Sequence, residues 1–132
     1  MVDSQCGDAS YILDTEKFEK APYTFDIIAA EEGYIVSMNT EKCGIASCML
    51  GAGRVTMDSK IDISAGIIIH KKVGDWVTKG DVLATMHTSN SELFDAAEKR
   101  YREAITIENT KPKMQPLIYA RITKEKIERL VE

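Results

Sequence analysis

One glycine-rich stretch of the chain, Leu50-Gly51-Ala52-Gly53-Arg54, could hold a phosphate group. Loops that cradle phosphate precede a helix, because the free N–H groups of the first helical turn then face the anion. These two glycines instead follow a helix that is predicted to begin at Thr40. We therefore interpret them as the C-terminal end of that helix, where glycine readily adopts a left-handed conformation. Arg54 remains a candidate contact for an anionic group.

The two histidines, His70 and His87, each end a predicted strand. His70 is followed by Lys71 and Lys72, and a histidine beside lysines could bind an anion or act as a base. However, the sequence places no matching nucleophile or carboxylate beside either histidine. We therefore interpret both as strand-end residues and predict no catalytic residue in the chain.

The three cysteines are Cys6, Cys43 and Cys48. An odd number of cysteines without a secretion signal is typical of free thiols in a reducing cytoplasm. Cys43 and Cys48 fall on one predicted helix, about 140° apart around its axis. They cannot share a metal ion without further ligands. The sequence has no Cys-x-x-Cys or His-x-x-x-His spacing that could supply such ligands. The sequence therefore predicts no metal site.

Composition and charge narrow the class of protein. The chain has 132 residues, of which 44% are hydrophobic and 29% charged, as in a typical soluble domain. A net charge of −4 argues against binding to nucleic acid or anionic lipid. No apolar run approaches the ~20 residues that span a bilayer. The chain starts in turn-like residues 4–8, which fit the tail of an upstream element or a frayed terminus equally well.

Hydrophobic periodicity predicts short strands interspersed with helices. The first half should contain a short helix over 13–20, a β-hairpin over 23–38, and the helix from Thr40 to the glycine pair. The second half should contain a buried strand at 67–69, two Gly-Asp turns around another short strand, and a strand at 82–87. The longest helix should run from about 90 to 104 and be followed by a strand at 117–122. Thr123 should cap a last helix with Ile127, Leu130 and Val131 on one side. This order favours an α+β domain over a doubly wound sheet.

Three segments, in their order and spacing, resemble the C-terminal domain of pyrimidine-nucleoside and thymidine phosphorylases. They are 50–54, the stretch Ile61-Asp62-Ile63-Ser64-Ala65-Gly66-Ile67, and His70-Lys71-Lys72-Val73-Gly74-Asp75 followed by Lys79-Gly80-Asp81. Shorter matches extend the resemblance over residues 5–122. Gln5-Cys6-Gly7-Asp8 is similar to a Gln-Gly-Gly-Asp element that lies just upstream of the domain, although Cys6 departs from it. Gly33-Tyr34 and Pro116-Leu117-Ile118-Tyr119 are similar to a turn and a late strand.

The resemblance implies an enzyme that cleaves a pyrimidine nucleoside with inorganic phosphate, giving the free base and a pentose 1-phosphate, with no cofactor. In that family the catalytic groups belong to a helical domain and a large α/β domain, whose motifs are absent from this chain. The resemblance therefore implies that the chain alone is inactive. It also implies a small domain of the hammerhead type, related to barrel-sandwich hybrids, with three to four helices. Residues 1–22 would be the tail of the α/β domain and a linker, and 23–132 the C-terminal domain.

Family membership would also define the partners of the chain. The remaining domains of the enzyme would pack against it, and domain closure would form the active site. The family dimerises through the helical domain, so a monomer is expected for this chain alone. We expect the glycines, Arg54 and the His-Lys-Lys run to face the cleft or the domain interface; these are Gly51, Gly53, Arg54, His70, Lys71 and Lys72.

Two other functions stay open. The run from Val73 to Leu83 also resembles biotinyl and lipoyl carrier domains, which present a modifiable lysine on a hairpin tip shortly afterwards. Here Met86-His87-Thr88-Ser89 follows and contains no lysine, while Lys113 lies far along the chain. The second alternative is a stand-alone interaction domain that uses the same fold.

Overall fold

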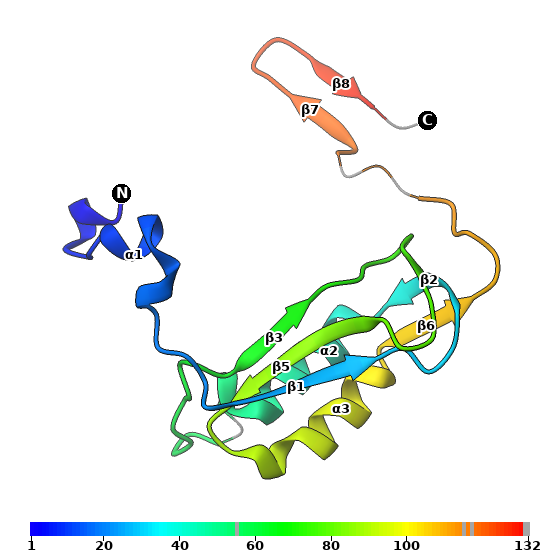
Figure 1. Cartoon of the computed structure of the whole chain (residues 1–132). Helices are drawn as coiled ribbons and strands as arrows, with labels where there is room; N and C mark the ends of the chain where they lie inside the picture. The colour runs from blue at the N-terminus through cyan, green and yellow to red at the C-terminus, as the bar shows by residue number, and fades with distance from the viewer. Residues whose placement is uncertain (55, 115, 117, 131–132) are drawn as a thin grey trace.

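Two three-stranded antiparallel sheets and two packed helices form the body of the chain (Figure 1). In this computed structural model, residues 1–54, 56–114, 116 and 118–130 are described. The first sheet has the strand order β1-β5-β3 and consists of β1 (Tyr23–Ile28), β5 (Val82–Thr88) and β3 (Gly66–Ile69). The second has the order β4-β2-β6 and consists of β4 (Trp76–Val77), β2 (Gly33–Met38) and β6 (Ile105–Glu108).

The predicted hairpin over 23–38 is wrong, although both of its strands exist. β1 pairs with β5, whereas β2 pairs with β4 and β6. After β1, the N–H of Ala29 donates to the carbonyl of Asp81 and its own carbonyl accepts from Gly80. These bonds hold the chain against the turn at 80–81 and carry it into the second sheet, so β2 cannot fold back on β1.

The two Gly-Asp turns are confirmed and lie on either side of β4. Gly74 and Gly80 have φ values of +95° and +97°, which L-residues with side chains rarely adopt. In each turn the aspartate carboxylate accepts a backbone N–H three residues earlier: Asp75 from Lys72 at 2.7 Å, and Asp81 from Thr78 at 3.1 Å. The strand predicted at 82–87 is present as β5. The strand predicted at 67–69 is β3, but it lies at the edge of its sheet and Ile68 is exposed.

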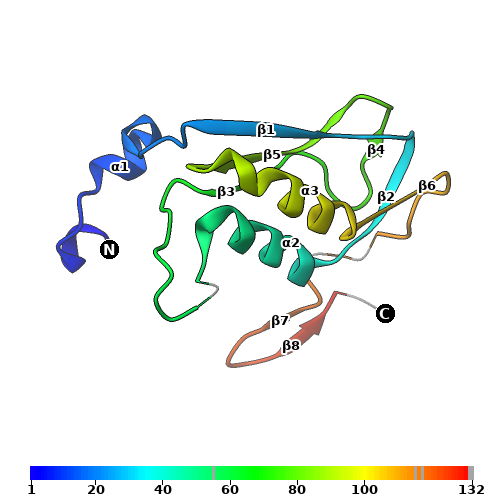
Figure 2. The same cartoon turned by 90° about the horizontal axis from the view of Figure 1, so that it is seen from below.

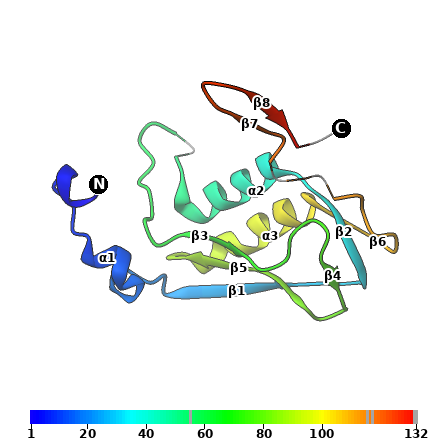
Figure 3. The same ribbon diagram turned by 90° about the horizontal axis from the view of Figure 1, so that it is seen from above.

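Two helices, α2 (Thr40–Ser47) and α3 (Phe94–Arg102), pack side by side and cover one face of the β1-β5-β3 sheet (Figure 2, Figure 3). Asn39 caps α2, one residue before the predicted Thr40, through a bond from the N–H of Lys42. Asn90 caps the 3-10 turn η4 (Ser91–Leu93) that leads into α3. The structure therefore confirms the longest helix, although it ends at 102 and leads directly into β6, a strand that the sequence interpretation missed.

The core lies between the two helices and the sheets. At its edge, the half-exposed Phe25 of β1 packs on Phe94 of α3, with the ring centroids 5.5 Å apart. Fully burying a large apolar side chain stabilises a protein by about 1.5–3 kcal/mol. The largest fully buried side chains are Tyr101, Ile27, Ile35, Leu50, Met86, Val77 and Thr88.

Both ends of the chain extend away from this core (Figure 1). The first 22 residues form η1 (Asp3–Gln5), α1 (Ser10–Leu13) and η2 (Thr15–Lys17), none of which buries a residue. In place of the helix predicted over 13–20, the chain thus has the end of α1 and the short turn η2. At the other end, β7 (Ala120–Ile122) pairs with β8 (Ile127–Arg129) in a hairpin. The predicted last helix is therefore wrong where it is described, because 127–129 is extended; Val131 lies outside the described residues, as does residue 117 of the predicted strand.

These elements confirm a small α+β domain with short strands, and the described residues contain three α-helices. The hammerhead assignment stays a prediction. Within the described part of the chain, no helix has the length and apolar character to span a membrane.

Candidate functional site

The glycine pair lies at the end of a π-helical turn, η3 (Cys48–Ala52), which continues α2. Gly51 has a φ of +108°, and its carbonyl accepts the N–H of Asp62 at 2.9 Å. The structure thus confirms that the glycines end a helix. A Cβ atom at Gly53 would crowd Sγ of Cys48, so the Cys48 side chain would have to move. The next residue, Arg54, is exposed.

Asp62 is the polar centre of this end of the domain. Its Oδ1 accepts the N–H and the hydroxyl of Ser64 at 2.9 and 2.7 Å, and its Oδ2 accepts the N–H of Ser89 at 2.9 Å. These hydrogen bonds, above all that from the Ser64 hydroxyl, lower the pKa of Asp62 to about 2. The sequence reasoning did not identify Asp62 as a site residue. An aspartate two residues before a serine is a turn signal, which could have predicted the hydrogen bonds between Asp62 and Ser64. It could not have predicted the bond from Ser89.

Thr88 makes a second set of hydrogen bonds, which joins the helix end to the central strand β5. The buried hydroxyl of Thr88 donates to the carbonyl of Leu50 at 2.7 Å, and its oxygen accepts the N–H of Asn90 at 3.2 Å. The side chains of Asp62 and Thr88 therefore hold together the helix end, the loop around Asp62 and the end of β5.

His70, Lys71 and Lys72 follow β3 at its opposite end. His70 Nε2 lies 2.8 Å from the hydroxyl of Thr85, which donates to Oδ1 of Asp26 at 2.6 Å. Because the single hydroxyl proton goes to the carboxylate, Nε2 of His70 must carry a proton and donate it to Thr85. Lys71 lies 3.5 Å from the carboxylate of Asp81. The side chains of His70 and Lys71 thus have interaction partners within this chain.

The predicted site residues do not form one cluster. Gly66, at the start of β3, pairs with His87 near the Asp62 end, whereas Ile69, just before His70, pairs with Ala84. The ladder between β3 and β5 thus separates Gly51, Gly53 and Arg54 from His70, Lys71 and Lys72. Sequence spacing could not reveal this separation, because it depends on the direction in which β3 runs.

His87 lies on the outer face of β5, between Thr24 of β1 and Gly66 of β3. It lines a hollow of about 500 Å³ beside the segment 19–21. Its Nε2 atom is buried and has no hydrogen-bond partner among the residues that the structure describes. The hollow is lined by Glu19, Lys20, two hydroxyl residues, His87 and apolar residues, so its one lysine is accompanied by a glutamate.

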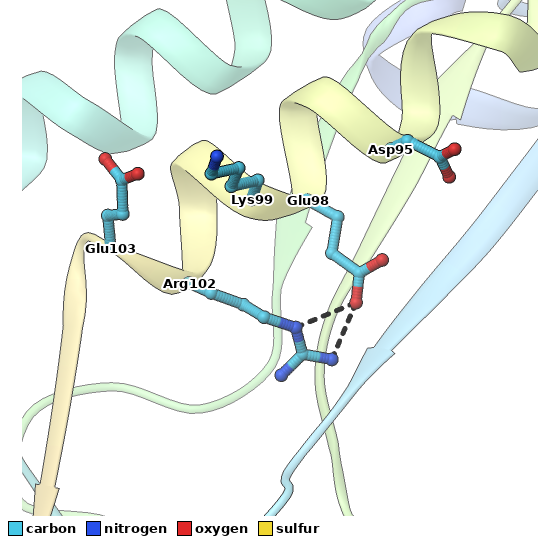
Figure 4. A pocket seen from close by; sticks show the side chains of 5 residues that line it. All are labelled: Asp95, Glu98, Lys99, Arg102 and Glu103. Carbon is cyan, nitrogen blue, oxygen red and sulfur yellow. Dashed lines mark hydrogen bonds and ion pairs between the residues drawn. The ribbon is translucent and has the colours of Figure 1, made fainter.

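A hollow of about 640 Å³ lies over the exposed side of α3 and is lined by charged side chains (Figure 4). Arg102 and Glu98 are paired at 2.7 Å, and Arg102 also donates to the carbonyl of Ile28 at 3.0 Å. Glu103 is paired with Arg100 at 3.1 Å. Such exposed pairs are typical of a solvated helix surface. Across the described parts of the chain, no three His, Cys, Asp or Glu residues gather as metal ligands would.

Comparison with known proteins gives a consistent result. The family model for the "Pyrimidine nucleoside phosphorylase C-terminal domain" matches residues 34–108. The chain is 38% identical over 120 residues to a pyrimidine-nucleoside phosphorylase of Geobacillus stearothermophilus, covering 91% of this chain and 28% of that protein. It is 39% identical over 122 residues to a pyrimidine-nucleoside phosphorylase of Staphylococcus epidermidis, covering 92% and 28%. The chain thus spans little more than a quarter of the length of these curated relatives.

Proposed function

Because the chain belongs to the family of pyrimidine nucleoside phosphorylase C-terminal domains, we propose that it serves as this domain in an enzyme that cleaves pyrimidine nucleosides with phosphate. The products would be the free base and a pentose 1-phosphate. The family match supports the proposal most strongly: it begins in β2 and ends with β6, and so includes the second sheet, both packed helices and most of the first sheet.

The chemistry of phosphorolysis explains why this domain alone should be inactive. The reaction needs cationic and hydroxyl groups around phosphate, together with groups that stabilise charge on the anomeric carbon and the leaving base. Among the described residues, Lys71, Arg100 and Arg102 are paired with carboxylates, and His70 is bonded to Thr85. We therefore propose that the catalytic residues belong to other parts of the enzyme.

The domain boundary that the sequence predicts is part of the same proposal. Residues 1–22 would link to the preceding part of the enzyme, and 23–132 would form the domain. The absence of buried residues from η1, α1 and η2 supports this boundary, as does the start of β1 at Tyr23. We also propose a cytoplasmic location, in keeping with the free Cys6, Cys43 and Cys48, and a monomeric state for the chain by itself.

Of the predicted site residues, Gly51, Gly53 and Arg54 fit the domain interface best. Arg54 is exposed, and it follows a helix end whose backbone is fixed by Asp62 and Thr88. We propose that Arg54 faces the catalytic part of the enzyme. His70, Lys71 and Lys72 would face it from the other end of β3 only if the interface extends along the whole strand.

The carrier alternative finds no support in the geometry. Carrier domains present their lysine on a hairpin tip, whereas Met86-His87-Thr88 lies inside the central strand β5, with Met86 fully buried. Mass spectrometry after co-expression with biotin and lipoate ligases should show the unmodified chain. An added biotin or lipoate would contradict our proposal.

A chimeric enzyme tests the proposed function. In the Geobacillus relative, the C-terminal segment that matches this chain is replaced by the chain itself, and uridine phosphorolysis is compared with that of the relative truncated before the segment. The chimera should cleave uridine and the truncated protein should not. A chimera that folds but is as inactive as the truncated protein would argue against the proposal.

A further inference from the structure

Two isoleucines are exposed on either side of Asp62. Ile61 is 48% exposed and Ile63 is 81% exposed, although both side chains are strongly apolar. We call residues 61–64 the docking loop. Single exposed apolar residues are common on protein surfaces, so their exposure alone does not indicate a binding surface.

The docking loop differs from an ordinary exposed loop because its backbone is fixed. The N–H of Asp62 donates to Gly51, and the carbonyl of Asp62 accepts the N–H of Ala65 at 3.1 Å. The carboxylate of Asp62 accepts three more hydrogen bonds, from Ser64 and Ser89. The loop therefore holds both isoleucines in place before any partner arrives, which reduces the conformational entropy lost on binding.

The docking loop lies at the end of the body where the N-terminal segment joins it (Figure 1, Figure 3). Tyr23, the first residue of β1, pairs with Thr88, and the next residue, Ser89, binds Asp62. Tyr23 is itself 48% exposed. The segment before it exposes further apolar side chains, namely Tyr11, Ile12, Leu13 and Phe18.

In an enzyme that ends with this domain, the preceding chain reaches the body at Tyr23, next to the docking loop. We propose that the docking loop inserts Ile61 and Ile63 into an apolar depression on the catalytic part of the same enzyme. The inference rests on the proposed function and names the surface through which it works. The relatives' greater part lies outside the matched region, which provides a partner large enough to cover the loop.

In this arrangement Ile61 and Ile63 supply apolar contact area, and Asp62 is a positioning residue. Burying an isoleucine is worth about 1.5–3 kcal/mol, which corresponds to at least a tenfold change in an equilibrium constant. A charge at position 63 would lose this contribution and would also need to be desolvated in the interface.

The experiment uses the chimera described above and the isolated chain. Ile63→Glu is compared with Ile45→Glu, a matched control on α2, where Ile45 is 40% exposed and far from the docking loop in sequence. In the isolated chain, both variants should melt close to the parent. In the chimera, Ile63→Glu should lower kcat/KM for uridine phosphorolysis about tenfold or more, whereas Ile45→Glu should change it less than about twofold. If Ile63→Glu prevents folding of the isolated chain, Ile63→Ala replaces it, with the same direction expected.

The outcomes separate the inference from the proposed function. An active parental chimera in which Ile63→Glu behaves like Ile45→Glu overturns the inference and leaves the proposed function intact. An inactive parental chimera argues against both the inference and the proposed function. A second copy of the chain could also cover the docking loop, and sedimentation of the isolated chain tests this. A dimer that Ile63→Glu dissociates would make the docking loop an interface between copies and would overturn the inference.

Discussion

The carboxylate of Asp62 accepts the backbone N–H of Ser89 at 2.9 Å and so joins two loops that lie 27 residues apart in the chain. The same side chain binds Ser64, and its backbone binds Gly51. One residue thus connects the end of α2, the approach to β3 and the segment between β5 and α3. The geometry of this end of the domain should therefore depend on the charge of a single carboxylate.

Replacing Asp62 by alanine should lower the free energy of unfolding by about 1 kcal/mol or somewhat more, because three hydrogen bonds to a partly exposed carboxylate are lost. Chemical denaturation of the isolated chain measures this change. Asp58→Ala, at an exposed aspartate of the same connection, is the control and should have little effect. Equal stability of the Asp62 and Asp58 variants would show that the network contributes nothing.

The stability should also depend on pH through Asp62. Its folded pKa of about 2 lies below the ~3.9 of an unfolded aspartate. The stabilisation is therefore complete above pH ~4 and is lost as the pH falls toward 2. Acid titration of unfolding should show a shallower loss in Asp62→Asn than in the parent over this window. Superimposable acid profiles would contradict the assignment.

Gly53 and Cys48 should be energetically coupled. A Cβ on Gly53 would lie 2.4 Å from Sγ of Cys48, so Gly53→Ala should cost about 1–3 kcal/mol through crowding. In a Cys48→Ala background the cost should be smaller, because the sulfur is absent while the Cβ of residue 48 stays. A double-mutant cycle by urea denaturation measures the coupling. Additive effects would show that the close approach does not govern this turn.

The Tyr101 hydroxyl is fully buried and has no hydrogen-bond partner in the described part of the chain, in contrast to the Thr88 hydroxyl, which donates to Leu50. Tyr101→Phe should therefore leave the free energy of unfolding unchanged or raise it by up to about 1 kcal/mol, while Thr88→Val should lower it by about 1–3 kcal/mol. Thermal unfolding distinguishes the two. A marked destabilisation by Tyr101→Phe would reveal a partner for the hydroxyl.

Burial, aided by the nearby Cys43, raises the pKa of Tyr101 to about 12. A raised pKa stabilises the fold fully below the unfolded value of ~10, and this stabilisation is lost as the pH rises toward 12. The alkaline loss of stability should therefore be smaller in Tyr101→Phe than in the parent. The measurement is the denaturation midpoint between pH 9 and 12; identical slopes would argue against a buried phenol.

Local signals predicted the turns and helix ends well. Gly74, Gly80 and Gly51 all adopt the positive φ that their positions suggested. The two Gly-Asp turns are also fixed locally, because each aspartate accepts a backbone N–H from three residues earlier. The existence of the longest helix was also predicted, and its residues Ala97 and Tyr101 are fully buried.

Strand pairing could not be predicted in the same way. β1 finds its partner about 60 residues later, and Ala29 is held by the turn at 80–81, so the local hairpin signal was overridden. The alternation of Ile105 and Ile107 is a visible strand signal, but the sequence interpretation left these residues unassigned. At the C-terminus, helix-forming residues after Thr123 are extended because Ile127 pairs with Ile122 of β7. The pairing of β3 with β5 separates Arg54 from His70.

Arg54 tests the proposed orientation of the domain. In the chimera, Arg54→Ala should change kcat or KM for uridine, because we propose that this exposed cation faces the catalytic part of the enzyme. The isolated chain should keep its melting temperature, since Arg54 lies on the surface. Unaltered kinetics together with unaltered stability would refute this orientation.

We propose that this domain helps to complete a phosphorolytic enzyme whose catalytic groups lie in its other parts. The most direct measurement is the release of uracil from uridine and phosphate by the purified chain, assayed beside the chimera under the same conditions. We predict no release above background for the chain and clear turnover for the chimera. Uracil release by the chain alone would contradict the account.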